Sequence, residues 1–157
     1  MIDLRIAPEP PDSALAHTLL GRYYQELAAR FPGGRAEFEP ARITAPKPEF
    51  TPPHGAFLVA WLDERGVGCG AVRVLDAHNA EIKSMWVDPA TRRLGVGRSM
   101  LAALERTAAE LGCHAVRLDT AAYLTEALPL YRSAGYTDIP AYNDNPYAAY
   151  WLEKPLG

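Results

Sequence analysis

The chain has 157 residues, 48% of them hydrophobic, which is enough for one domain with a substantial core. Its net charge of -3 gives no basic field of the kind that binds nucleic acid or anionic membranes. No apolar run approaches the roughly 18 residues of a membrane span, and the N-terminus lacks the pattern of a signal peptide. We therefore expect a cytoplasmic protein with neither nucleic-acid nor membrane partners.

The cysteines and histidines show no spacing that is typical of a metal site. Cys69 and Cys113 match neither a zinc motif nor a redox motif. His17 is expected on a helix, and His54 and His78 in or beside loops, without a second ligand at metal spacing. We expect two buried thiols and no metal.

The first third of the chain predicts a strand, a helix and a long loop. Residues 2–7 alternate between apolar and polar types, as a strand does. Asp12 or Ser13 can cap a helix that runs to about Arg30. Residues 31–55 hold six of the fourteen prolines, which predicts a loop with at most a short helical piece near 35–38. Such a loop is either a lid or binding loop, or a plain connection.

The middle of the chain predicts an antiparallel meander of three strands. Two apolar runs, Phe57–Leu62 and Val67–Val74, are separated by a turn at residues 63–66. A second turn at residues 76–79 leads to a third strand, Ala80–Val87.

The remaining elements alternate between helices and strands. A helix from Gly95 is followed by a strand at His114–Asp119, and Thr125 can cap a helix that reaches about Ala134. Two closing strands are expected at Tyr136–Ile139 and Ala148–Glu153. The fold class is α+β, of the α/β/α type, with a mixed, mostly antiparallel sheet and helices on both faces.

A glycine-bearing loop lies between the third meander strand and the next helix. Arg92-x-x-Gly95-x-Gly97 opens the helix, and a helix N-terminus with exposed backbone N–H groups is suited to phosphate. The motif alone is weak. A dinucleotide-binding fingerprint needs a third glycine where this chain has Met100, and a nucleotide-binding P-loop needs a Gly-Lys-Ser/Thr sequence that is absent.

The order of the elements around this loop resembles the GNAT superfamily of acyl-CoA-dependent N-acyltransferases. The loop matches the family's Q/R-x-x-G-x-G/A pattern, and Leu130–Tyr131 with Gly135–Tyr136 matches its "LY…GF" segment. The segment from Tyr142 to Leu156 further resembles small bacterial members of undefined substrate. The resemblance implies a single N-acetyltransferase domain over residues 1–157, acetyl-CoA as co-substrate without a metal, and a homodimer as an expected assembly.

The resemblance also assigns residues to coenzyme A. Its pyrophosphate would bind the N–H groups from Leu94 to Ser99, and nearby arginines would add charge, although each could also be an ordinary surface arginine. The strand before the loop would pair with the pantetheine arm and supply an oxyanion-binding N–H group. The residues assigned in this way are Met85, Trp86, Val87, Arg92, Arg93, Leu94, Gly95, Val96, Gly97, Arg98 and Ser99.

Two catalytic roles follow from the resemblance. Glu81 lies where several members keep a glutamate base, although it could equally be a strand residue that faces solvent or pairs with Lys83. Tyr131 matches the tyrosine that protonates the leaving thiolate in many members, although it could be a core residue. The sequence departs from the family at Leu124, where many members have an amide that binds the cofactor arm.

The acceptor is the least determined part of the prediction. Candidates to line its pocket are Arg22, Tyr23, Tyr24, Tyr142 and Asn145, all of which could instead be core or surface residues. The leading hypothesis is transfer of an acetyl group from acetyl-CoA to a primary amine of a small molecule or peptide, by direct attack in a ternary complex. The alternative is a non-catalytic acyl-CoA sensor or interaction module.

Overall fold

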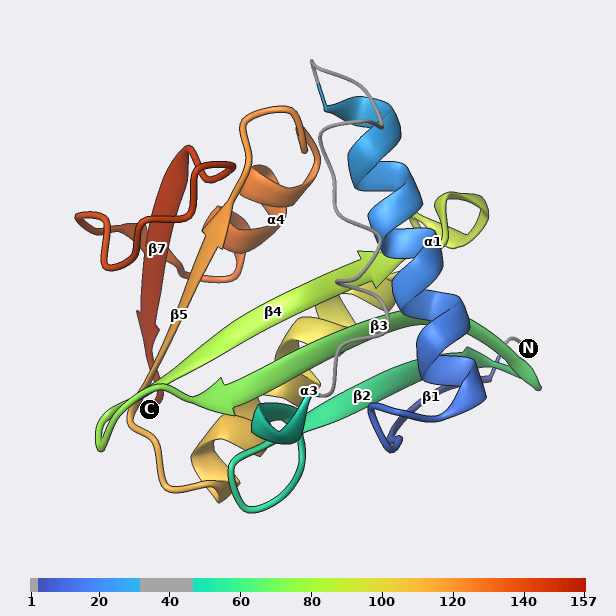
Figure 1. Cartoon of the computed structure of the whole chain (residues 1–157), viewed down its shortest axis with the longest axis horizontal. Coiled ribbons are helices and arrows are strands. Elements are labelled where there is room, and N and C mark those ends of the chain that lie inside the picture. The colour runs from blue at the N-terminus through green and yellow to red at the C-terminus, as the bar shows by residue number, and fades with distance from the viewer. Residues whose placement is uncertain (1–2, 32–46) are drawn as a thin grey trace.

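A computed structural model describes residues 3–31 and 47–157, which form one seven-stranded sheet with helices on both faces (Figure 1). The sheet order is β1-β2-β3-β4-β5-β7-β6, and every neighbouring pair is antiparallel except β4 and β5. This arrangement confirms the predicted mixed, mostly antiparallel sheet. The strands are β1 (Leu4–Pro8), β2 (Gly55–Leu62), β3 (Arg65–Val74), β4 (Asn79–Val87), β5 (Ala115–Thr120), β6 (Thr137–Asp138) and β7 (Tyr150–Pro155).

Three α-helices occur in the described ranges: α1 (Ala14–Arg30), α3 (Val96–Glu110) and α4 (Ala127–Ser133). Ser13 caps α1 by accepting a hydrogen bond from the Ala16 N–H. In Figure 1, α1 crosses one face of the sheet and α3 lies behind the other. Each face has its own apolar core, because strand side chains alternate between the two faces. No helix within the described ranges is both long and apolar enough to cross a membrane.

The element boundaries differ from the sequence prediction in three places. The hairpin between β2 and β3 turns at Asp63 and Glu64 alone, since Asp63 adopts a positive φ of 54° and Arg65 already belongs to β3. Pro8 is the last residue of β1 and pairs with Leu58. A proline is tolerated there because β1 is an edge strand. Helix α4 is shorter than expected, because its N-cap is Glu126 in place of Thr125 and its last residue is Ser133.

Part of the proline-rich segment lies outside the described residues. The described portion begins with a single 3₁₀ turn, η2 (Pro48–Phe50), which buries Phe50 in the core on the α1 face. Residues 32–46 are outside the described ranges, and so is the predicted helical piece at 35–38. The predicted lid role therefore stays a prediction. Both cysteines, Cys69 and Cys113, are free and buried, as expected.

A bulge near the end of β4 determines how this strand meets its neighbours. Cys69 pairs with Trp86 and Ala71 pairs with Lys83, so two residues of β4 lie opposite Gly70 alone. The extra residue is accommodated at Ser84, whose φ is 55°. A Cβ atom on Gly70 would lie 2.8 Å from a methyl carbon of Leu104 in α3, so a larger residue opposite this bulge would force the Leu104 side chain to shift.

The two parallel strands in the middle of the sheet separate soon after they begin. Strands β4 and β5 pair only from Asn79–Ala115 to Glu81–Arg117, yet β4 continues to Val87 and β5 to Thr120. Beyond Glu81, the backbone of β4 is paired with β3 on one side only. The gap between the strands opens toward the glycine-bearing loop and places the candidate site there.

Candidate active site

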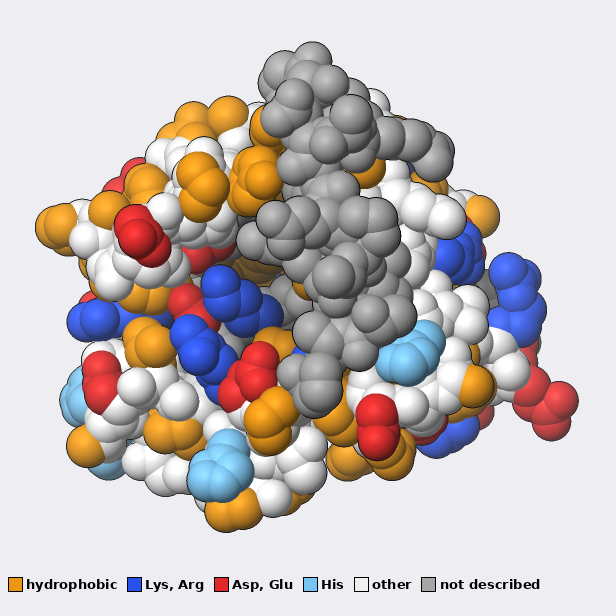
Figure 2. Space-filling model, viewed as in Figure 1, with side chains coloured by type: hydrophobic (Ala, Val, Ile, Leu, Met, Phe, Trp, Pro, Cys, Tyr) orange, Lys and Arg blue, Asp and Glu red, His pale blue; other side chains and the backbone are white. Residues whose placement is uncertain are grey.

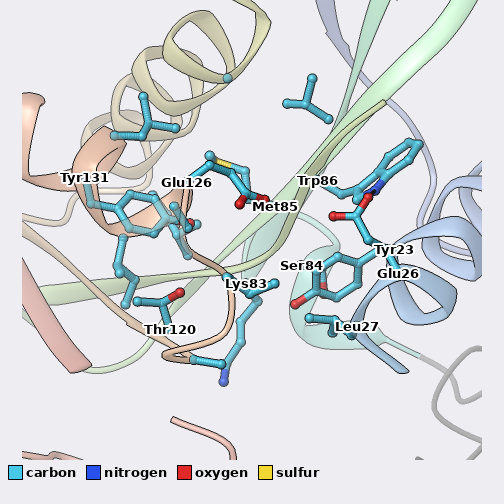
Figure 3. A pocket seen from close by; sticks show the side chains of 18 of the residues that line it. Tyr23, Glu26, Leu27, Lys83, Ser84, Met85, Trp86, Thr120, Glu126 and Tyr131 are labelled. Atoms are coloured by element: carbon cyan, nitrogen blue, oxygen red, sulfur yellow. Dashed lines mark hydrogen bonds between the residues drawn. The ribbon is translucent and has the colours of Figure 1, made fainter. Parts of the chain in front are cut away.

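A cavity of about 700 Å³ occupies the gap between β4 and β5. Its walls come from α1, the end of β4, the loop before α3, β5, α4 and the segment before β7. Figure 3 shows Lys83, Ser84 and Met85 of β4 between Tyr131 on one side and Tyr23, Glu26 and Leu27 of α1 on the other. A cavity of this size, with apolar walls and a few polar groups, is typical of small-molecule sites.

The loop before α3 offers free hydrogen-bond donors to this cavity. Helix α3 begins with Gly95, at a φ of 81°, as its N-cap and has no side-chain cap. No described residue accepts a hydrogen bond from the N–H groups of Gly95, Val96, Gly97 or Arg98, and all four residues line the cavity. Together with the helix dipole, these donors suit a phosphate group.

The predicted row of phosphate-binding N–H groups is shorter at both ends than the sequence suggested. The Leu94 N–H donates to the Thr91 carbonyl oxygen at 3.3 Å. The Ser99 N–H donates to the Gly95 carbonyl oxygen at 3.0 Å, because it is the first internal bond of the helix. Neither Leu94 nor Ser99 lines the cavity, so the donors are Gly95 through Arg98.

The three arginines of the loop have different surroundings. The Arg92 guanidinium donates to Glu26 at 2.8 Å and lies 3.8 Å from a Glu126 carboxylate oxygen. Arg93 is exposed at the cavity, and Arg98 donates to the Ser133 hydroxyl at 3.2 Å. The charge of Arg92 is therefore balanced within the protein, whereas Arg93 and Arg98 face the cavity mouth without a carboxylate partner among the described residues.

Met85, Trp86 and Val87 all line the cavity, as predicted for the strand that would pair with pantetheine. Met85 and Val87 pack toward the core on the α3 face. Trp86 packs on the α1 face, where its indole N–H donates to Glu26 at 3.3 Å. Because these side chains are used in packing, what β4 offers to a ligand is its unpaired backbone. Leu124, at the position where the family often has an amide, also lines the cavity.

Tyr131 projects from α4 into the cavity wall and is 7% exposed. Burial raises the pKa of the Tyr131 hydroxyl above its ordinary value, and the negative charge of Asp119 adds a smaller increase. The hydroxyl therefore keeps its proton at neutral pH and can donate it. This location agrees with the predicted acid role without testing it.

Glu81 occupies a different environment from the one expected of a base. Its side chain is 1% exposed and is not part of the cavity lining. One carboxylate oxygen accepts a 2.8 Å hydrogen bond from the Arg73 Nε, and the other accepts a 2.7 Å hydrogen bond from the Tyr142 hydroxyl. The Lys83 Nζ lies 3.8 Å away. Both oxygens thus already have partners inside the protein.

The five candidates for the acceptor pocket divide into two groups. Tyr23, Tyr24 and Asn145 line the cavity. Arg22 does not, because its guanidinium pairs with Asp88 at 3.1 Å and stacks over the Trp86 ring. Tyr142 does not line the cavity either, because its hydroxyl donates a hydrogen bond to Glu81.

Four charged residues that line the cavity were not recognised as site candidates: Glu26, Lys83, Asp119 and Glu126. Asp119 is 9% exposed in its side chain and accepts hydrogen bonds from the amide groups of Asn143 at 2.7 Å and Asn145 at 3.0 Å. A single charged residue at the end of a strand gives no sequence motif, so only the fold brings these groups together. The described residues contain no cluster of three or more side chains that could hold a metal ion.

Sequence comparison gives the family of this chain. The sequence model of the "Acetyltransferase (GNAT) family" matches residues 20–136. An IAA acetyltransferase of Azospirillum brasilense is 35% identical over 104 residues, which cover 64% of this chain and 67% of that protein. An uncharacterized N-acetyltransferase of Schizosaccharomyces pombe is 34% identical over 107 residues, covering 66% of this chain and 65% of that protein.

Solved structures show the same fold. A GNAT-family acetyltransferase from Staphylococcus aureus superposes with a TM-score of 0.80 at 16% identity, covering 99% of this chain and 100% of that one. A GNAT acetyltransferase from Elizabethkingia anophelis, solved with acetyl-CoA bound, has a TM-score of 0.68 at 18% identity, with 98% of both chains covered. The family match covers most of the sequence, so the chain that forms this cavity and the loop before α3 belongs to the GNAT acetyltransferase family.

Proposed function

We propose that this protein transfers an acetyl group from acetyl-CoA to a primary amine of a small molecule or peptide, in a ternary complex and without a metal. The family uses acyl-CoA as its acyl donor. The observation that carries the proposal is the separation of β4 from β5 directly beside the free N–H groups of Gly95 to Arg98. The gap can receive an extended arm whose far end carries phosphate.

The cofactor residues have distinct roles in this proposal. The N–H groups of Gly95 to Arg98 bind the pyrophosphate, and Arg93 and Arg98 add positive charge. The unpaired backbone of Met85 to Val87 hydrogen-bonds to the pantetheine arm as another strand would. A backbone N–H group in this stretch also stabilises the oxyanion that forms on the thioester during attack.

Tyr131 is the proposed acid. The neutral amine attacks the thioester carbon, a C–N bond forms as the C–S bond breaks, and the leaving thiolate takes the hydroxyl proton of Tyr131. For Glu81 we propose a structural role instead of the predicted base role, because its side chain is 1% exposed, lies outside the cavity lining and is held by Arg73 and Tyr142.

The function is tested by incubating the protein with acetyl-CoA and a panel of primary amines while free thiol is measured. Release of coenzyme A that depends on an amine is the expected result. Calorimetric binding of acetyl-CoA without turnover on any amine would favour the non-catalytic sensor. An absence of both binding and turnover would refute the proposal.

The Tyr131→Phe variant tests the acid. Loss of a general acid lowers kcat by about 100-fold or more, whereas the affinity for coenzyme A should change little. Tyr136→Phe is the matched control. Tyr136 packs edge-on against Tyr131, but its hydroxyl lies outside the cavity and donates a 2.9 Å hydrogen bond to Glu105. Equal turnover of Tyr131→Phe and wild type would remove Tyr131 from the mechanism.

A further inference from the structure

Lys83 and Asp119 form an oppositely charged pair inside the cavity. They extend from β4 and β5 at the point where these strands have separated, and both line the cavity. The Lys83 Nζ lies 3.8 Å from an Asp119 carboxylate oxygen. In Figure 2, basic and acidic side chains gather on the face of the sheet that these strands share. The pair therefore presents one cation and one anion, side by side, to a ligand.

Both members of the pair keep unused hydrogen-bonding capacity. Lys83 has three N–H donors and makes no hydrogen bond to a described residue, because 3.8 Å is too long for one. Asp119 accepts one hydrogen bond on each oxygen, from Asn145 and Asn143, whereas an ionised carboxylate accepts about four. The two amide groups fix the orientation of the carboxylate and leave acceptor sites open.

Asp119 is also near the residue proposed to protonate the thiolate. Its charge contributes to the raised pKa of Tyr131, which places the carboxylate within electrostatic reach of that hydroxyl. Glu81 is outside the cavity lining, whereas Asp119 and Tyr131 both belong to it. An amine bound to Asp119 would thus lie in the same cavity as the proposed acid.

Building on the proposed N-acetyltransferase function, we propose that Asp119 and Lys83 bind the two ends of a zwitterion, and that the acceptor is a free α-amino acid. The acceptor ammonium pairs with Asp119 and its carboxylate with Lys83. In an α-amino acid these groups are attached to one carbon, which matches the close spacing of the pair. A peptide N-terminus lacks the adjacent carboxylate and would bind through Asp119 alone.

The chemical step balances with these residues. Asp119 takes one proton from the bound ammonium, and the neutral nitrogen attacks the thioester carbon. The C–N bond forms, the C–S bond breaks, and the thiolate leaves with the Tyr131 proton. The second proton lost by the nitrogen restores the Tyr131 hydroxyl through solvent. Asp119 releases the first proton to solvent, so the products are the N-acetyl amino acid, coenzyme A and one proton.

The remaining cavity wall selects the side chain of the amino acid. Tyr23, Tyr24 and Leu27 of α1 and Tyr147 of the C-terminal segment line the cavity together with the charged pair. Tyr23 is half-buried, and the loss of solvent around its hydroxyl raises the pKa of that group. These aromatic and aliphatic surfaces favour an apolar or aromatic side chain over a charged one.

The test uses pairs of amines that differ only in the carboxylate. L-Phenylalanine is compared with phenethylamine, and L-leucine with isopentylamine, in the acetyl-CoA assay with the full chain. A charge-assisted hydrogen bond contributes enough to make kcat/KM about 10- to 100-fold higher for the amino acids. Lys83→Met should remove this preference by lowering kcat/KM for the amino acids to about that of the plain amines.

Asp119→Asn should lower kcat/KM for the amino acids and for the plain amines alike. Arg106→Met and Glu110→Gln are controls that remove one charge of each sign from the exposed face of α3. Unchanged acetyl-CoA affinity and circular dichroism establish that each variant is folded. If Asp119→Asn does not fold, Lys83→Met carries the test by itself.

Two results would overturn the inference while the proposed function stands. The first is a plain amine that is acetylated as well as its amino acid by the wild type. The second is acetylation of other amines in a broad panel without any activity on amino acids. Turnover of no amine at all would instead refute the proposed function.

Discussion

The role of Glu81 can be decided by a single substitution. Glu81→Gln keeps the shape of the side chain and removes its charge. An amide can still accept from the Arg73 Nε with its oxygen and can donate to the Tyr142 hydroxyl oxygen with its nitrogen. Both contacts then survive as hydrogen bonds to an uncharged amide, which are weaker than the present ones to a carboxylate at 2.8 and 2.7 Å.

The expected cost follows from these two contacts. A hydrogen bond to a charged group contributes roughly 1.5–3 kcal/mol and a neutral one about 1 kcal/mol. The charged side chain of Glu81 is 1% exposed, and Glu81→Gln removes the desolvation cost of burying that charge, which offsets part of the lost hydrogen-bond energy. We therefore expect Glu81→Gln to lower the free energy of unfolding by about 1–2 kcal/mol, with kcat/KM close to wild type.

Urea denaturation measures the stability, and the thiol-release assay measures kcat/KM. Glu153→Gln is a matched control on the same row of the sheet. Glu153 accepts from the Arg117 Nε at 2.8 Å but is 30% exposed, so its loss should cost less than about 1 kcal/mol. A fall in kcat/KM of about 100-fold with unchanged stability would make Glu81 the base and refute this reasoning.

Three further predictions concern the loop, an ion pair and a thiol. Gly95→Ala should lower the free energy of unfolding by about 1 kcal/mol in urea denaturation, because φ of residue 95 is 81°. Gly21→Ala in α1 should raise the free energy of unfolding, because Gly21 has open space around it. Equal effects of the two substitutions would contradict this account. The Arg30 guanidinium lowers the pKa of Glu126 from 4.5 to about 2, so this exposed pair stabilises the protein above pH 4.5 and less so as pH falls toward 2. Glu126→Gln should therefore cost under about 1 kcal/mol at pH 7 and nothing near pH 2; a cost that persists in acid would argue against the pair. Burial raises the pKa of the Cys69 thiol to about 12, so a thiol reagent at pH 8 should react with Cys69 only after denaturation, and fast labelling of the native protein would show the site to be open.

The strands and helices were predictable because their signals are local. The apolar run of Phe57–Leu62 and the apolar stripe after Gly95 each depend on neighbouring residues, and each gave an element near its true position. The position of the bulge has no local signal, since Ser84 adopts a positive φ that is more typical of glycine or asparagine. Across the sheet, Gly70 lies opposite the bulge and packs against α3.

The candidate site was predictable only where a motif reports the chemistry. Arg92-x-x-Gly95-x-Gly97 indicated the proposed phosphate-binding loop, because the backbone conformation at Gly95 depends on glycine. Glu81 was assigned from its distance along the chain to that motif, and this distance carries no information about Arg73 and Tyr142. Asp119 could not be recognised, because Asn143 and Asn145 reach it only after the C-terminal segment has folded back.

The separation of β4 and β5 gives this sheet an edge in its interior. Exposed strand edges elsewhere invite pairing with other chains, and proteins protect them with short strands, prolines or charges. Here the unpaired stretch after Glu81 lies inside the sheet and lines the cavity, whereas β1 and β6 are the outer edges. The proposed pantetheine arm, which has amide groups of its own, would complete this interior edge as a strand would.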